Sequence, residues 1–167
     1  MEKAVKNDSE YEKTRQEAYA PLIERVHVDH RDKVFIFTLS CGLGWQEIIF
    51  KLAAELDSIW EGFQGAKGPD CWEILQVKEK FGGLRFYVEY LHVEAVPRLK
   101  MDPDLERRYQ TSKNAIDGAE ADAGMTCERC GKPGHLAGKG YIATVCDECE
   151  KRWNERSAAG AWPSLFG

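Results

Sequence analysis

The chain has no apolar run long enough to cross a membrane and no apolar leader at its N-terminus. We therefore expect a protein of the cytoplasm, where thiols stay reduced, and no membrane partner. Basic charge is not in excess either, because 23 Lys and Arg residues stand against 28 Asp and Glu residues, a net charge of −5. Bulk electrostatics do not attract nucleic acid, so any nucleic-acid contact requires a local basic patch.

Catalytic motifs are also scarce. The sequence contains no nucleophile elbow, phosphate-binding glycine loop or dinucleotide fingerprint, and the pair Gly42-x-Gly44 is too short to count. One group of acid–base side chains, His27, Asp29 and His30, could form a catalytic site with Glu79. On a strand His27 and Asp29 would share a face while His30 pointed away, so we interpret this segment as a strand end and a polar turn.

Four of the six cysteines form two pairs with the spacing of metal ligands. They are Cys127, Cys130, Cys146 and Cys149. This pattern predicts a four-thiolate Zn²⁺ site, and four thiolates close the coordination shell, so the zinc is expected to be structural. Two disulfides are the alternative, which the expected compartment disfavours. His135 could replace one ligand but is interpreted as a loop residue, and Cys41 and Cys71 are expected to be reduced core thiols.

The segments around these cysteines predict a small finger. A Gly-Lys-Gly turn at 138–140 precedes a strand at 141–145, and a helix is expected from Asp147 to about Ser157. A Cys turn, a hairpin and a ligand-bearing helix in this order resemble the treble-clef class of zinc fingers over roughly residues 125–157. The link to the preceding helix is short, so the finger should pack on the main domain, with Trp153 as an anchor.

The main domain shows one strand and two helices besides its hairpin. The apolar run 34–39 predicts a buried strand. From Trp45 to Trp60 apolar residues recur at helical spacing, and Gly62 should end that helix. A second helix is expected to start after the N-cap Asp102 and to run to Gly124, with a narrow apolar stripe.

Gly82-Gly83 lies between two β-rich runs and predicts a hairpin with a two-residue turn. The expected pairs on the apolar face are Phe81 with Leu84, Glu79 with Phe86, Val77 with Val88, and Leu75 with Tyr90. Those on the polar face are Lys80 with Arg85, Lys78 with Tyr87, and Gln76 with Glu89. The polar face thus gathers a basic patch that could bind an anion, an acidic protein surface or nucleic acid, and its residues are Lys78, Lys80, Arg85 and Tyr87. The alternative is a solvated face neutralised by Glu73 and Glu89.

Three stretches carry a resemblance. They are Cys41-Gly-Leu-Gly-Trp45, the run Gln76–Tyr87 with its central KEKFGGLRFY, and Cys127–Gly134 together with Cys146 and Cys149. Over roughly residues 41–150 the chain resembles a family of small uncharacterised proteins encoded by bacteriophages and bacterial prophages. The family has no settled activity, so the resemblance implies a setting, the bacterial cytoplasm during infection or lysogeny, and no mechanism.

These patterns together predict an α+β fold, in which helices pack on a small antiparallel sheet and a treble-clef-like zinc finger follows. The expected parts are a polar tail, either a frayed helix or disordered (1–18), an α+β domain (19–124), the finger (125–157) and a C-terminal tail (158–167). Trp162, Leu165 and Phe166 of that tail could fold back on the core or dock on a partner.

The first functional hypothesis is a non-enzymatic accessory protein that binds a host or phage protein, such as a component of a host defence system. The alternatives are a nucleic-acid-binding module that uses the basic hairpin face, and an enzyme built on the His, Asp and Glu side chains.

Overall fold

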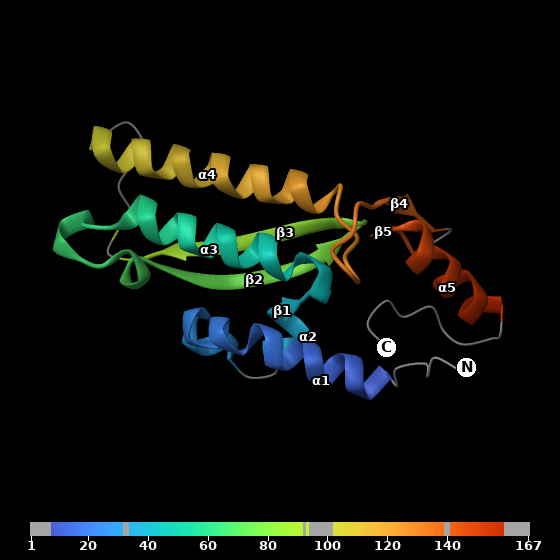
Figure 1. Ribbon diagram of the computed structural model, residues 1–167. Helices are drawn as coiled ribbons and strands as arrows, with labels where there is room; N and C mark the ends of the chain where they lie inside the picture. The colour runs from blue at the N-terminus through green and yellow to red at the C-terminus, as the bar shows by residue number, and fades with distance from the viewer. Residues whose placement is uncertain (1–7, 32–33, 92, 94–101, 139–140, 159–167) are drawn as a thin grey trace.

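A computed structural model describes residues 8–31, 34–91, 93, 102–138 and 141–158 (Figure 1). The C-terminal tail from residue 159 onward, for which folding back on the core and docking on a partner are the two alternatives, lies outside these ranges. The helices are α1 (Asp8–Tyr19), α2 (Val34–Phe37), α3 (Gln46–Trp60), α4 (Pro103–Ala123) and α5 (Asp147–Ala158). The strands are β1 (Leu39–Ser40), β2 (Trp72–Lys80), β3 (Gly83–Tyr90), β4 (His135–Ala137) and β5 (Ala143–Val145). Short 3₁₀ helices lie at η1 (Ala20–Arg25), η2 (Val28–His30), η3 (Leu43–Trp45), η4 (Phe63–Gly65) and η5 (Gly68–Asp70).

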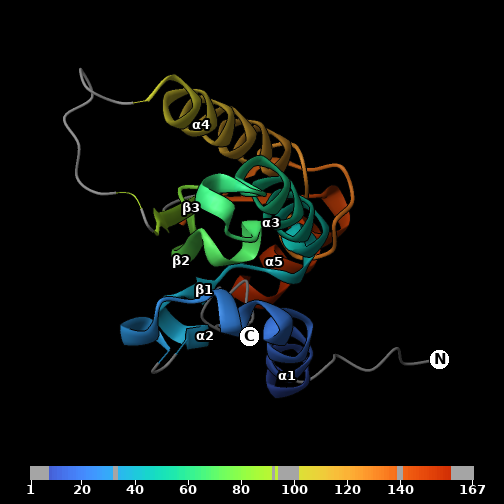
Figure 2. The same ribbon diagram turned by 90° about the vertical axis from the view of Figure 1, so that its left-hand side faces the viewer.

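The predicted α+β class is confirmed, with one three-stranded sheet in the order β1-β2-β3 and a separate pair β4-β5. The larger sheet is mixed and not purely antiparallel, because β1 pairs with β2 in parallel, Leu39 opposite Val77. Parallel strands need a crossover, and α3 supplies it between β1 and β2. α3 and α4 run side by side along the sheet, α1 and α2 lie at the β1 side, and the smaller pair with α5 lies at the turn of the β2–β3 hairpin (Figures 1 and 2).

The core forms between α3 and the sheet. The predicted stripe of α3 is confirmed: Trp45, Ile49, Leu52, Leu56 and Trp60 are all buried. The helix ends as expected before Gly62, which takes a left-handed φ of 75°. The predicted second helix is α4, and the Asp102 side chain caps it by accepting a hydrogen bond from the Asp104 N–H at 2.7 Å.

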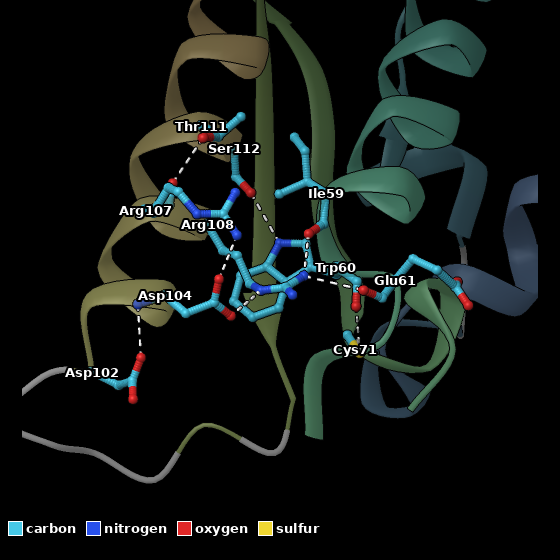
Figure 3. A network of polar contacts seen from close by, with 10 residues as sticks. All are labelled: Ile59, Trp60, Glu61, Cys71, Asp102, Asp104, Arg107, Arg108, Thr111 and Ser112. Carbon is cyan, nitrogen blue, oxygen red and sulfur yellow. Dashed lines mark hydrogen bonds and ion pairs between the residues drawn. The ribbon is translucent and has the colours of Figure 1, made fainter. Parts of the chain in front are cut away.

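Polar side chains join the end of α3 to the start of α4 (Figure 3). The buried Trp60 indole N–H donates to Ser112 Oγ at 2.9 Å. The Arg108 guanidinium donates to the backbone carbonyls of Ile59 and Glu61, and Asp104 Oδ2 holds it from the other side at 2.7 Å. The carbonyls at a helix C-terminus lack partners within the helix, so Arg108 of α4 satisfies groups that α3 itself leaves open.

The predicted buried strand over 34–39 is wrong for its first four residues, which form α2 and leave only Leu39–Ser40 as a strand. A short continuous apolar run does not distinguish helix from strand by periodicity. Tertiary contacts decide it here, because Arg15 of α1 donates to the carbonyl oxygens of Phe35 at 2.9 Å and Leu39 at 2.6 Å.

The N-terminal segment is a helix from Asp8, the first of the two predicted alternatives, and it is not merely a solvated charge run. Tyr11, Arg15 and Tyr19 of α1 are buried, and the Tyr19 hydroxyl donates to the Gly42 carbonyl at 2.7 Å. A basic side chain among acids looks solvated in a sequence, and its buried acceptors lie far along the chain.

The predicted hairpin register is wrong by two residues near the turn. The turn residues are Phe81 and Gly82, both with left-handed φ (53° and 78°), so Lys80 pairs with Gly83 and Lys78 with Arg85. The shift is even, so Val77, Leu84 and Phe86 still face the core as expected. The register changes again at Leu75, an irregularity that turns Trp72 and Ile74 into the core in place of Leu75.

Candidate metal centre

The four predicted ligands come together at one point. The thiol sulfurs of the two Cys pairs all lie within 4.8 Å of one another. Cys130 Sγ is 3.6 Å from Cys146 Sγ and 3.7 Å from Cys149 Sγ. A disulfide bond would measure about 2.05 Å, and all six cysteines are free thiols, so the disulfide alternative is wrong. Cys41 and Cys71 are buried outside the cluster, as predicted for core thiols.

Local backbone structure explains why the four sulfurs point toward one position. The Gly131 N–H donates to the Cys127 carbonyl at 2.9 Å, which closes a tight turn, and Gly131 itself has a left-handed φ of 77°. The second pair brackets the start of α5, with Cys149 in its first turn. Burial raises the pKa of Cys146, but the Cys149 N–H and the neighbouring thiols outweigh it and lower the pKa to about 7. Burial, together with the neighbouring thiols, raises the pKa of Cys130 and of Cys149 instead. Of these three thiols only Cys146 favours the thiolate by itself, and a bound metal cation would supply the charge that holds the others deprotonated.

His135 does not join the cluster. It is exposed on β4, where Nε2 lies 3.2 Å from Glu150 Oε2 and Nδ1 lies 3.7 Å from Asp147 Oδ1. The interpretation as a spare ligand is not supported, and the residue belongs to a strand and not to a loop.

The motif Cys41–Trp45 forms a cradle for the first Cys pair. The Gly44 N–H donates to the Glu128 carbonyl at 2.6 Å, the Gly42 N–H donates to Glu128 Oε1 at 2.9 Å, and the Trp45 indole donates to the Thr126 carbonyl at 2.8 Å. The backbones approach so closely that a Cβ at Gly44 would lie 2.0 Å from the Cys127 carbonyl oxygen. No local pattern in the sequence indicates this role, because a glycine pair is common and its partner lies far along the chain.

Glu128 is the one acid buried in this contact. Burial, aided by the charge of Glu79, raises its pKa to about 8 although the Gly42 N–H lowers it. Its Oε2 has no hydrogen-bond partner within the described part of the chain. The Glu128 side chain therefore accepts one hydrogen bond, from Gly42, and this bond holds the cradle against the turn of the first Cys pair.

The turn of the β2–β3 hairpin forms the second contact with the finger. Thr144 Oγ1 of β5 donates to the Gly82 carbonyl at 2.6 Å, and the Tyr141 hydroxyl donates to Glu79 Oε2 at 2.7 Å. Glu79 Oε1 accepts the Gly82 N–H at 2.6 Å. Glu79 is thus partnered by a hydroxyl and a backbone N–H, and within the described residues no Lys or Arg forms an ion pair with it.

Apolar side chains remain exposed around this contact. We call them the tip surface; it consists of Phe81 (74% exposed), Leu136 (62%), Tyr141 (39%) and Ile142 (39%). A Cβ at Gly82 would lie 2.3 Å from Leu136 Cδ2, so the finger and the hairpin turn share this surface. The sequence does not predict the tip surface, because the expected hairpin register turns Phe81 toward the core.

The four residues of the predicted basic patch stay on one face of the hairpin, because Lys78 pairs with Arg85 and Gln76 with Tyr87. Arg85 forms an ion pair with Glu120 of α4 at 3.2 Å, and the same carboxylate accepts the Phe86 N–H at the free edge of β3. The Lys80 ammonium lies 5.7 Å from the Phe81 ring centroid at the turn, whereas the Lys78 ammonium lies 5.5 Å from the Tyr87 ring. The predicted opposition of Lys80 and Arg85 is wrong, since Lys78 stands opposite Arg85.

The predicted acid–base set does not assemble. His27 Nε2 lies 3.9 Å from Glu73 and 4.0 Å from Glu89, and its ring centroid is 5.4 Å from that of His30. Glu79 follows Glu73 by six strand residues, about 20 Å at the usual rise of about 3.3 Å per residue. A catalytic site that combines His27 with Glu79 is therefore wrong on geometry.

No protein-family model, no curated protein and no solved structure matches the chain. Within the described ranges, none of the helices is both long and apolar enough to span a bilayer. Function must accordingly be argued from the residues of the site.

Proposed function

We propose that the four-cysteine cluster holds a structural Zn²⁺ ion. Tetrahedral coordination with Zn–S bonds of about 2.3 Å places the sulfurs about 3.8 Å apart, close to the 3.6 and 3.7 Å separations around Cys130. Zinc would supply the positive charge that four thiolates share, and it would cross-link the first Cys turn to α5. Cys turn, β4–β5 hairpin and α5 follow one another in the order typical of a treble clef, which supports that part of the proposal.

With four protein ligands no coordination position stays open for a substrate. The zinc therefore serves the fold, and we place the function elsewhere: the protein acts by binding another macromolecule and not by catalysis.

The tip surface is the observation that carries this role. A bulky residue such as Phe81 in the left-handed region costs roughly 1–2 kcal/mol, and Phe81 recovers none of it by burial because its side chain is 74% exposed. Strain retained at an exposed apolar side chain is typical of a binding position. Leu136 pairs with Thr144, which contacts the turn, so Leu136 extends the surface around Phe81, and the exposed Ile142 directly precedes β5.

We propose a host or phage protein as the partner, with a host defence component among the candidates that the family resemblance suggests. The net charge of −5 argues against a long polyanion. An apolar centre with a polar rim is typical of protein interfaces.

Capture from nuclease-treated bacterial lysate tests the proposal with the full-length, zinc-loaded chain as bait. We expect a specific protein that Phe81→Ser and Leu136→Ser baits lose. Ile36→Ser is the matched control, because Ile36 on α2 is 64% exposed and Leu136 is 62% exposed. A partner retained by both tip variants, or lost equally with Ile36→Ser, would contradict the role of the tip surface. Material recovered only without nuclease would favour nucleic acid.

A further inference from the structure

A pocket opens on the sheet face beside the middle of β2, at residues 75–78. It has a volume of about 540 Å³, within the size range of small-molecule sites. Four segments line it: η2, the residue before β1, β2 at its irregularity, and β3. Because the pocket lies between the β1-side segments and the hairpin, neither the metal cluster nor the tip surface contributes to it.

One end of the pocket carries an unneutralised cation. The Lys78 ammonium lies over the Tyr87 ring, 5.5 Å from its centroid, in a cation–π contact, and both side chains line the pocket. No ion pair joins Lys78 to a carboxylate within the described residues. Its cross-strand neighbour is Arg85, also a cation, whose charge Glu120 neutralises at 3.2 Å. Lys78 is thus left to attract an anionic group at this end.

The middle of the pocket offers a planar surface. The Tyr87 side chain is 44% exposed, and the Leu75 side chain, which the irregularity of β2 turns out of the core, lines the pocket as well. An exposed tyrosine ring with apolar carbon beside it suits the stacking of a flat ring, and nucleobases stack on aromatic side chains in this way.

The other end of the pocket holds hydrogen-bonding groups. The His30 Nδ1–H donates to the Leu75 carbonyl at 2.9 Å, which fixes the tautomer and leaves Nε2 as an acceptor. Thr38 donates its hydroxyl to the His30 carbonyl at 3.1 Å, which ties the pocket wall to η2. The Asp29 carboxylate, 80% exposed, lies at this rim, 3.9 Å from His27 Nδ1, and a carboxylate can accept hydrogen bonds from an amino group of a ligand.

We propose that this pocket binds one nucleotide, with its phosphate at Lys78, its base against Tyr87 and an exocyclic amino group of the base toward Asp29. From one end of the pocket to the other lie a cation, an aromatic ring and a carboxylate acceptor. A nucleotide presents a phosphate, a flat base and the amino group of that base in the same order. The same unit could be a free nucleotide or one residue of a single strand. The net negative charge of the chain favours the free nucleotide. This inference does not depend on the proposed interaction through the tip surface.

Isothermal titration of the full-length, zinc-loaded protein tests it, with AMP, CMP, GMP, UMP, the four nucleosides and a short mixed single strand as probes. We expect saturable binding of one mononucleotide per chain, tighter for the three amino-bearing bases than for UMP. Lys78→Met should weaken it at least about tenfold, and Tyr87→Ser by about tenfold. Lys80→Met is the matched control: it removes an equal charge two residues along β2, outside the pocket, and should bind as the wild type does.

The thermal denaturation midpoint of each variant shows whether the fold persists. Tighter, steeply salt-dependent binding of the single strand would support the pocket and assign the nucleotide to a strand. The proposal is overturned if no probe binds, if nucleosides bind as tightly as nucleotides, if UMP is preferred, or if Lys80→Met weakens binding as much as Lys78→Met.

Discussion

The backbone N–H of Gly44 donates a hydrogen bond of 2.6 Å to the carbonyl oxygen of Glu128, within the first Cys pair. The candidate metal centre is therefore attached to the main domain by direct contacts and is not an independent unit on a flexible linker. The prediction that the finger packs on the main domain is confirmed by this bond and by that of Thr144 with Gly82, and Trp153 was the anchor expected for it. That ring contacts Tyr141 edge-to-face at 6.1 Å and packs within the finger.

Gly44→Ala should destabilise the protein and disturb the metal centre. The added Cβ would lie 2.0 Å from the Cys127 carbonyl oxygen and 2.5 Å from the Gly131 nitrogen, both of them backbone atoms that must move. We expect a loss of about 2 kcal/mol, or roughly 4–8 °C in Tm for a chain of this size. Thermal denaturation followed by circular dichroism measures it, and a wild-type Tm would show that the cradle is not tightly packed.

Gly118→Ala is the matched substitution with the opposite expectation. Gly118 lies in the exposed middle of α4, and a Cβ there would meet nothing within 4 Å. Alanine favours a helix over glycine by about 1 kcal/mol, so the Tm should rise by a few degrees. A fall in Tm would mean that the surface of α4 at Gly118 has no room for a methyl group.

Removal of the metal should unfold the finger. Zinc binding in a four-thiolate site contributes on the order of 10 kcal/mol to folding. Metal analysis should find one zinc ion per wild-type chain, and both a strong chelator and Cys127→Ser should open the chain to limited proteolysis. Cys71→Ser is the control, because Cys71 is buried outside the cluster and its thiol donates to the Lys67 carbonyl, as a hydroxyl also can. Protease resistance in metal-free Cys127→Ser would refute a structural metal.

Arg15→Met tests whether α1 belongs to the folded domain. The guanidinium is 4% exposed and donates to the carbonyls of Phe35 and Leu39, which Met would leave without partners. We expect a loss of about 3 kcal/mol in urea unfolding. Lys13→Met on the same helix removes an exposed cation, 78% exposed at its side chain, and should unfold close to the wild type. Equal curves for the two variants would mean that α1 is dispensable.

Some of this architecture could be predicted because its signals are local. The ligand spacing, the stripe from Trp45 to Trp60 and the Asp102 cap each involve residues that lie close together in the sequence. They hold regardless of what the rest of the chain does, and the structure has each of them where it was expected.

The misplaced parts depend on contacts between distant segments. The run 34–39 contains a helix whose carbonyls Arg15 satisfies, and the hairpin turn lies at Phe81 and Gly82, where Thr144 of the finger donates to the Gly82 carbonyl at 2.6 Å. The glycines at 42 and 44 are packed by Glu128, which no local pattern indicates. The proposed tip surface follows from these contacts and could not be predicted from the sequence, whereas Lys78 and Tyr87 of the proposed pocket belong to the predicted basic patch.

Ser112→Ala should destabilise the joint between α3 and α4. Ser112 is fully buried, and its hydroxyl accepts the Trp60 indole N–H at 2.9 Å. Alanine would leave that donor buried without a partner, which costs about 1–3 kcal/mol. The neighbouring Thr111→Ala is the control, since the exposed Thr111 hydroxyl bonds only to the Arg107 carbonyl of its own helix among the described contacts, and alanine is the better helix former. Urea unfolding should separate the two variants. If Ser112→Ala unfolds with the wild type, Trp60 is held by its contacts with the Tyr90 and Tyr109 rings, at centroid distances of 4.7 and 5.6 Å, and not by the hydrogen bond.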